Sequence, residues 1–310
     1  MPRSIDFKEM PCWKRILSFL VQLVLFIILF ALLVIIGQFL ITSVLTIPAA
    51  SILGKIPLHD WFLALSASFL TVFLLDRWQQ KKGMATYGFS SKKIGKSLLL
   101  GLIVGSSILL ISFGILLMGN WAKITHFDFQ AGLFLAWALF FLIQPLAEEI
   151  IMRSFLQTQL HRHFGTHPGL FITALVFTLL HSANDNITLL ASIQIFTGGY
   201  LMGLLYLQTK NIWATFAMHA SWNFLQSTVF GFAVSGMETY SILKTETTGP
   251  DWLTGGAFGL EGSLLTLVLI LLAITYYWKA SKKTHPFGEQ ELENDPIALE
   301  DHFVEEQKSS

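Results

Sequence analysis

The chain has 310 residues, and its 20 lysine and arginine residues balance 20 aspartate and glutamate residues, so the formal net charge is zero. Only 13% of the residues are charged and 53% are hydrophobic, whereas soluble globular proteins have about 25% charged and about 45–50% apolar residues. With a single cysteine, Cys12, this composition excludes a disordered chain, a basic nucleic-acid-binding protein and a disulfide-held secreted domain. The sequence predicts a polytopic membrane protein.

The apolar runs predict an all-α bundle of about eight transmembrane helices. The first run, residues 16–48, has no charged residue and exceeds the ~20 residues that a helix needs to cross a bilayer. It is also far longer than the ~7–15 apolar residues of a signal peptide, so we expect a first helix here. Seven further runs follow at 58–75, 98–118, 132–158, 168–183, 188–207, 211–232 and 263–278.

The basic residues test this helix count, because lysine and arginine collect in the short cytoplasmic loops of membrane proteins. With eight helices, seventeen of the twenty basic residues fall in the two tails and in alternate loops. The other loops hold only Lys55, Lys123 and Lys244. Both termini are therefore predicted to lie in the cytoplasm.

The chain divides into one helical domain between two polar tails. Residues 1–15 are a predicted cytoplasmic N-terminal tail, and residues 16–278 form the transmembrane domain. Residues 279–310 hold eight of the twenty acidic residues and are predicted to be a disordered cytoplasmic tail. The glycine-rich outside loop 233–262 is either a cap over a cavity or a plain connector. Cys12, beside the first helix, is expected to be an inert thiol rather than an acylation site.

Three charged residues interrupt the fourth apolar run: Glu148, Glu149 and Arg153. An ionisable group at bilayer depth costs roughly 2.5–3.5 kcal/mol on insertion scales, so it usually faces the bundle interior and has a partner. Glu149 and Arg153 are four residues apart and can pair on one helix face, where Arg153 would keep Glu149 ionised. Glu148 points about 100° away and is free to face a different neighbour. The cluster serves either the fold, as an ion pair, or a reaction.

Two of the nine histidines, His181 and His219, lie well inside apolar runs, and His219 shares a helix face with Asn223. A single membrane histidine is more often a hydrogen-bond partner than a catalyst, but two histidines with an asparagine and a carboxylate pair favour function. At 1.5 Å per residue, Glu148, His181 and His219 lie roughly 20, 18 and 14 Å from the cytoplasmic face. This similar depth predicts one buried polar cavity.

These residues could hydrolyse an amide inside the membrane by two routes. In the first, Glu148 and His181 hold a water, and the carboxylate acts as the general base. His219 and Asn223 then donate hydrogen bonds to the oxyanion. In the second, Glu148, His181 and His219 bind Zn²⁺, since one carboxylate and two imidazoles with an open position form a known catalytic zinc set. The sequence leaves the choice between Zn²⁺ and no metal open.

The motifs of competing chemistries are absent from the sequence. It contains no Tyr-Asp or Gly-x-Gly-Asp pair of an intramembrane aspartyl protease, no Gly-x-Ser-x-Gly and no His-Glu-x-x-His. P-loop and dinucleotide fingerprints are also missing, so no nucleotide is expected to drive transport in this chain.

Three ordered motifs together resemble those of a known family. They are Glu148-Glu149-x-x-x-Arg153, Phe177-x-x-x-His181 and His219-x-x-x-Asn223, each on a separate predicted helix. With them the chain resembles the CAAX-processing and bacteriocin-processing (CPBP, or Abi) family of intramembrane proteases. The resemblance covers about residues 80–280 and includes the small-residue pattern Phe196, Gly199 and Gly203 of the sixth helix, which suits close packing. The first helix and the acidic tail lie outside it.

The resemblance implies an intramembrane endopeptidase of the glutamate or metallo type. By position, Glu148 would activate water with His181, while His219 and Asn223 would stabilise the oxyanion. The remaining members of the first motif, Glu149 and Arg153, would support it.

The substrates that the resemblance implies range from prenylated C-terminal CAAX proteins to bacterial peptides and membrane proteins. We therefore expect a multi-pass protein of a bacterial cytoplasmic membrane, whose partners are the lipid bilayer and a membrane-associated protein or peptide substrate, with no nucleic acid. The alternative is a non-proteolytic membrane scaffold, bacteriocin-immunity protein or transport-accessory protein, which keeps the polar cluster for structure or proton binding.

Overall fold

The computed structural model describes residues 10–44, 56–80 and 83–284. Three of the sequence predictions therefore fall wholly or partly outside the described residues. These are the start of the N-terminal tail, the end of the first predicted helix near Pro48, and the acidic tail from residue 285 onward.

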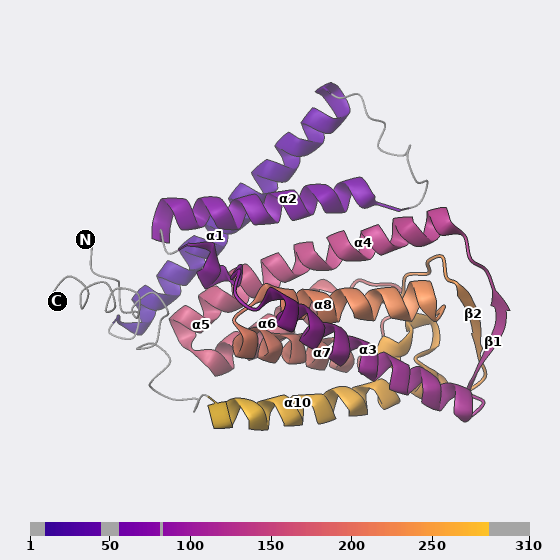
Figure 1. Cartoon of the computed structure of the whole chain (residues 1–310). Coiled ribbons are helices and arrows are strands. Elements are labelled where there is room, and N and C mark those ends of the chain that lie inside the picture. Colours follow the sequence, from indigo (N-terminus) through magenta and orange to yellow (C-terminus); the bar gives the residue numbers. More distant parts are fainter. Residues whose placement is uncertain (1–9, 45–55, 81–82, 285–310) are drawn as a thin grey trace.

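Helices make up most of the described structure, and every predicted apolar run contains one (Figure 1). The longer helices are α1 (Cys12–Phe39), α2 (Leu58–Leu75), α3 (Ile94–Met118), α4 (Ala131–Glu149), α5 (Thr158–Phe164), α6 (Thr166–Leu180), α7 (Leu189–Thr209), α8 (Ile212–Asn223) and α10 (Leu264–Thr284). A single turn, α9 (Asp251–Thr254), precedes α10. Short π-helical segments follow α1, α2, α4 and α8 at Leu40–Val44, Asp76–Gln80, Ile150–Gln157 and Phe224–Val229. 3₁₀ turns lie at Met84–Tyr87, Gly256–Phe258 and Leu260–Gly262.

Five helical segments are long and apolar enough to cross a membrane: Cys12–Thr42, Leu58–Trp78, Ile94–Met118, Ala131–Phe164 and Leu189–Thr209. Two shorter apolar helices are Thr166–Leu180 and Leu264–Ala280. These segments support a polytopic α-helical membrane protein. The count of eight spans and the cytoplasmic position of the termini stay predictions.

A small antiparallel sheet departs from the all-α expectation. Strand β1 (Ala122–Phe127) joins α3 to α4 and pairs with β2 (Leu243–Thr247), with a bulge between Ile124 and His126. β1 has β-branched residues at Ile124 and Thr125, which favour the extended backbone. Figure 1 shows the sheet at the end of the bundle opposite to the start of α1 and the end of α10. The sheet fastens the loop between α8 and α10 to that end.

The central helix of the bundle is α8, which packs against α3, α4 and α7. Ten of its twelve residues are buried, as expected for a helix surrounded on all sides. Gly101 and Gly105 of α3 lie against it so closely that a Cβ at either position would strike backbone atoms of Ala214 or Met218. Glycines four residues apart permit this approach. They therefore fix the position of the two polar motif residues on α8.

The helix that holds the paired glutamates is continuous from Ala131 to Phe164 but is not a regular α-helix throughout. Pro145 lies inside α4, where it removes one backbone donor, and the π-helical segment begins directly after Glu149. π-helical turns inside α-helices are frequent at functional sites. The glutamates thus lie near the middle of a 34-residue helix, at a change in helical geometry.

Replacing Gly101 or Gly105 by alanine is expected to destabilise the protein by about 1–3 kcal/mol, because the added methyl group meets the α8 backbone. The melting temperature in detergent micelles measures this effect. Gly114→Ala is the matched control on α3, because nothing lies within 4 Å of a Cβ added there. Equal melting temperatures for all three variants would contradict the prediction.

Candidate active site

A fully buried ion pair stands at the end of α4. Glu149 Oε2 lies 3.2 Å from Arg153 Nε, and neither side chain is exposed. Arg153 Nη2 also donates to the carbonyl oxygen of Gly199 on α7, at 3.3 Å, and the guanidinium lies 5.4 Å from the centre of the Phe177 ring. Breaking such a pair leaves an uncompensated buried charge. The predicted pairing of Glu149 with Arg153 is confirmed, and it connects α4 to α7.

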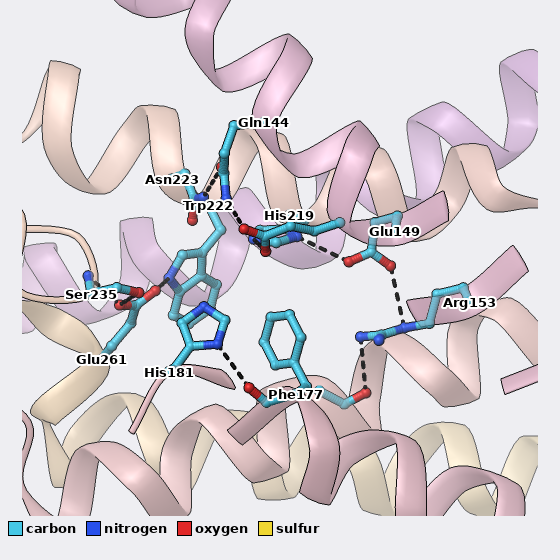
Figure 2. Close-up of polar contacts among 12 residues, drawn as sticks. Gln144, Glu149, Arg153, Phe177, His181, His219, Trp222, Asn223, Ser235 and Glu261 are labelled. Carbon is cyan, nitrogen blue, oxygen red and sulfur yellow. Dashed lines mark hydrogen bonds and ion pairs between the residues drawn. The ribbon is translucent and has the colours of Figure 1, made fainter. Parts of the chain in front are cut away.

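His219 lies between the two carboxylates of the first motif, and Figure 2 shows its contact with Glu149. Its Nδ1 is 3.0 Å from Glu149 Oε1, and its Nε2 is 3.9 Å from Glu148 Oε2. The shorter contact is a hydrogen bond, which Nδ1–H donates to the carboxylate. The longer one exceeds hydrogen-bond distance but matches a gap bridged by one water. Glu149 thus orients the imidazole so that Nε2 faces Glu148.

Gln144, one turn before Glu148 on α4, joins α4 to α8. Its Nε2 donates to Glu148 Oε1, and its Oε1 accepts from Asn223 Nδ2 at 3.2 Å. One oxygen of Glu148 is therefore held, whereas Oε2 is buried and has no hydrogen-bond partner among the described residues. A buried polar atom without a partner is costly, so Oε2 is the atom of this carboxylate that is open to a further hydrogen-bond donor.

His181 is the first residue after α6, and its Nδ1 lies 2.8 Å from the carbonyl oxygen of Phe177. A carbonyl oxygen can only accept, so Nδ1 holds the proton and Nε2 of the neutral ring is an acceptor. The Phe177 ring contacts both histidines, with its centre 4.5 Å from the His181 ring and 6.0 Å from the His219 ring. Nε2 of His181 makes no hydrogen bond within the described residues, and no direct contact joins this ring to Glu148 or Glu149 there.

A cavity of about 50 Å³ opens beside the histidines, which is room for a few water molecules. It lies among α6, α7, α8, α10 and the loop between α8 and α10, and its polar lining includes His181, His219, Asn223, Ser235 and Glu261. The glycine-rich loop therefore forms part of the cavity wall.

Glu261 is the acidic residue that this loop places at the cavity (Figure 2). Its Oε1 accepts from Trp222 Nε1 at 3.1 Å, and its Oε2 accepts from the backbone N–H and the hydroxyl of Ser235, at 2.6 and 2.8 Å. Burial raises the pKa of the Glu261 carboxyl, and the hydrogen bonds from Ser235 act against that rise. The charge on this carboxylate therefore depends on the donors around it.

The predicted residues gather in one region, but the two glutamates meet the same histidine and not different neighbours. The sequence predicts a water shared by Glu148 and His181, and a different neighbour for each glutamate. Within the described residues, no hydrogen bond or ion pair joins Glu148 to His181, and both glutamates meet His219, at opposite ring nitrogens. The reason is that His219 lies within the central helix α8, whereas His181 follows the last turn of α6.

Two polar residues of the site, Gln144 and Glu261, were not predicted from the sequence. Gln144 has a sequence signal, because it is a polar residue inside an apolar run, four residues before Glu148 and on its helix face. Glu261 has no such sequence signal, because its loop contains three other acidic residues from which the sequence does not distinguish it: Glu238, Glu246 and Asp251.

The predicted zinc ligands can be tested against the donor geometry. Among the described residues, no group of three histidine, cysteine, aspartate or glutamate side chains is placed to hold a metal ion. Nδ1 of each candidate histidine is already bonded, in His219 to Glu149 and in His181 to the Phe177 carbonyl. Glu148, the candidate carboxylate ligand, is held by Gln144 through one oxygen. Each candidate ligand thus keeps one donor atom, Nε2 of either histidine or Oε2 of Glu148, and only the spacing of these groups speaks against a zinc set among the described residues.

Residues 130–225 match the family model of the type II CAAX prenyl endopeptidase Rce1-like proteins. The matched segment contains all three motifs, from Glu148 to Asn223, and it confirms the resemblance to the CPBP family over these residues. Ser235 and Glu261 lie beyond it. No curated protein matches the chain at a significant level.

The two adjacent glutamates are expected to differ in their effect on stability. Glu149→Gln leaves the buried Arg153 without its counter-ion and should destabilise the protein by about 3–5 kcal/mol. Glu148→Gln should change stability little, because an amide can keep the bond with Gln144 and the side chain is 17% exposed. Thermal unfolding in detergent compares the two variants. Equal loss of stability in both would contradict this division.

Proposed function

We propose that this chain is an intramembrane endopeptidase of the CPBP, or CAAX-protease, type, which hydrolyses peptide bonds of membrane-associated, prenylated or peptide substrates. The observation that supports this most directly is Glu148 Oε2, a buried carboxylate oxygen without a hydrogen-bond partner among the described residues, 3.9 Å from His219 Nε2. The match of residues 130–225 to the type II CAAX prenyl endopeptidases supports the same reaction.

In the proposed reaction, Glu148 acts as the general base. Its Oε2 accepts a proton from a water as the water oxygen attacks the carbonyl carbon of the scissile amide. Arg153 already balances the charge of Glu149, so Glu148 is the carboxylate left for this step. His181, whose Nε2 is an acceptor, would hold the same water from the cavity side.

Attack on the carbonyl places negative charge on its oxygen. Asn223 Nδ2 has a second hydrogen besides the one it donates to Gln144, and His219 can donate through Nε2 when its ring is doubly protonated. The proton held by Glu148 then passes to the leaving nitrogen as the C–N bond breaks. Hydroxyl is added to the carbonyl carbon and hydrogen to the nitrogen, so the elements of one water are consumed.

The protein is proposed to lie in a bacterial cytoplasmic membrane with both termini in the cytoplasm. Basic residues flank the described helices at the end where α1 begins and α10 ends, and Lys14, Arg15, Lys96, Lys210 and Lys279 are examples. In this orientation the loop between α8 and α10 lies on the opposite side. The proposed partners are the lipid bilayer and a membrane-associated protein or peptide substrate.

Glu148→Ala or His181→Ala is expected to lower cleavage by at least about 100-fold without loss of folded protein, because each removes a group that handles the reacting water. The measurement compares membrane-protein fragments in cells with wild-type and variant protein, and looks for fragments that vanish.

Glu238→Ala, which removes an exposed acid of the same chain, is the control and should leave the fragments unchanged. Normal cleavage by either active-site variant would refute the mechanism. Loss of folding or of partner binding, with no fragment that depends on Glu148, would instead favour a scaffold, immunity or transport-accessory role.

The orientation can be tested with thiol reagents, because Cys12 is the only cysteine of the chain and is exposed at the start of α1. An impermeant maleimide applied to intact cells should leave Cys12 unlabelled. In a Cys12→Ser background, Asp251→Cys should be labelled, because Asp251 is exposed in the loop between α8 and α10. The reverse pattern would place the termini outside.

A further inference from the structure

Glu261 lies outside the three motifs, yet its carboxylate connects several parts of the site. It accepts three hydrogen bonds, one from the indole of Trp222 and two from Ser235. Trp222 directly precedes Asn223 and also lines the cavity. One side of this carboxylate is therefore connected to the end of α8, where the proposed oxyanion donors lie.

The other side of the carboxylate connects to the segment that follows His181. Ser235 donates both its backbone N–H and its hydroxyl to Glu261, and its carbonyl oxygen accepts from Asn184 Nδ2 at 3.1 Å. Asn184 is three residues after His181, and its backbone N–H donates to the His181 carbonyl at 3.1 Å. An unbroken series of hydrogen bonds thus runs from Glu261 through Ser235 and Asn184 to His181.

The turn that contains Glu261 is itself anchored to the bundle. Gln194 Nε2 of α7 donates to the Leu260 carbonyl at 3.2 Å, and Gln226 Nε2 donates to the Ala233 carbonyl at 2.7 Å. These bonds hold the backbone on either side of the cavity wall. The Glu261 side chain connects the turn to Trp222 of α8 and to Ser235, and a backbone bond from the Gly236 N–H to the Phe258 carbonyl, at 3.2 Å, also joins the two halves of the loop.

We propose that Glu261 is a positioning residue for the reaction, which holds Trp222 and Ser235 so that the His181 segment and the end of α8 face the same cavity. This inference rests on the proposed endopeptidase function. The residue does not touch the reacting atoms. It acts through the indole of Trp222 on one side and through Ser235 on the other.

The chemistry of the three donors explains why a carboxylate is needed. An ionised carboxylate only accepts hydrogen bonds, and here both oxygens face N–H or O–H donors. The amide of glutamine has nearly the same shape, but its NH₂ would face either the indole N–H or the Ser235 donors. Aspartate is one methylene shorter and cannot span both groups from the same backbone position.

Glu261→Gln is expected to lower kcat/KM about 10–100-fold, because small misplacements of catalytic groups have effects of this size. The measured reaction is formation of a membrane-protein fragment that requires Glu148. Glu238→Gln is the matched control, because Glu238 is an exposed acid in the same loop.

Trp222→Phe removes the indole N–H and leaves an aromatic ring. In that background, Glu261→Gln should lower kcat/KM by a smaller factor than it does in the wild type, because one of the mismatched donors is gone.

A spectroscopic measurement tests the positioning without any substrate. In protein labelled with 5-fluorotryptophan, the ¹⁹F resonance that disappears in Trp222→Phe identifies Trp222 among the nine tryptophans. This resonance should shift in Glu261→Gln and stay unchanged in Glu238→Gln.

The outcomes separate this inference from the proposed function. An unchanged Trp222 resonance in Glu261→Gln would overturn it, and so would a shifted resonance with wild-type kcat/KM. If no fragment depends on Glu148, the endopeptidase proposal fails, and the positioning role in that reaction fails with it. A shifted resonance would then show only that Glu261 orders Trp222. A shift together with reduced kcat/KM is the result expected.

Discussion

The buried ion pair of Glu149 and Arg153 is the interaction on which the site depends. Both side chains are fully buried, so each charge requires a partner inside the protein. Besides pairing with each other, Arg153 donates to the Gly199 carbonyl of α7, and Glu149 accepts a hydrogen bond from His219 of α8. One pair of charges thus fixes α4 relative to two neighbouring helices, and it orients the His219 imidazole at the same time. The absence of a side chain at Gly199 is part of this arrangement, because a Cβ there would lie 3.3 Å from the Phe177 ring.

This pair also explains why two adjacent glutamates have different properties. Successive residues of an α-helix point about 100° apart, so Glu149 pairs with Arg153 and the Nδ1 side of His219, whereas Glu148 faces the Nε2 side of His219. Glu148 is instead held through one oxygen by Gln144, which leaves Oε2 buried and facing His219 Nε2. In the proposed reaction, the first motif therefore contains one structural and one reactive carboxylate.

The sequence predicted the features of the site that depend on local geometry. The i,i+4 pairing of Glu149 with Arg153 and the shared face of His219 and Asn223 follow from helical periodicity alone. What it did not predict depends on how the helices pack. The approach of His219 to both glutamates depends on the packing of α8 against α4, and the β1–β2 pairing requires two loops far apart in sequence to meet. The helix spans followed from apolar runs, whereas the departures from regular α-helix at residues 150–157 and 224–229 gave no such signal.

Two parts of the chain line the cavity, namely the segment 130–225 and the loop that follows it. The groups that we propose to react lie within residues 130–225, which match the Rce1-like endopeptidases, and the proposed hydrolysis requires fixed distances among them. Ser235 and Glu261 belong to the loop beyond that segment, and this loop is held by hydrogen bonds to the wall it completes. A change in the loop can therefore alter the shape of the cavity while the Glu148, Glu149 and Arg153 cluster keeps its geometry. In the proposed reaction the loop contributes cavity wall and the positioning residue Glu261, so a change there is expected to alter both the shape of the cavity and the placement of the groups at His181 and Asn223.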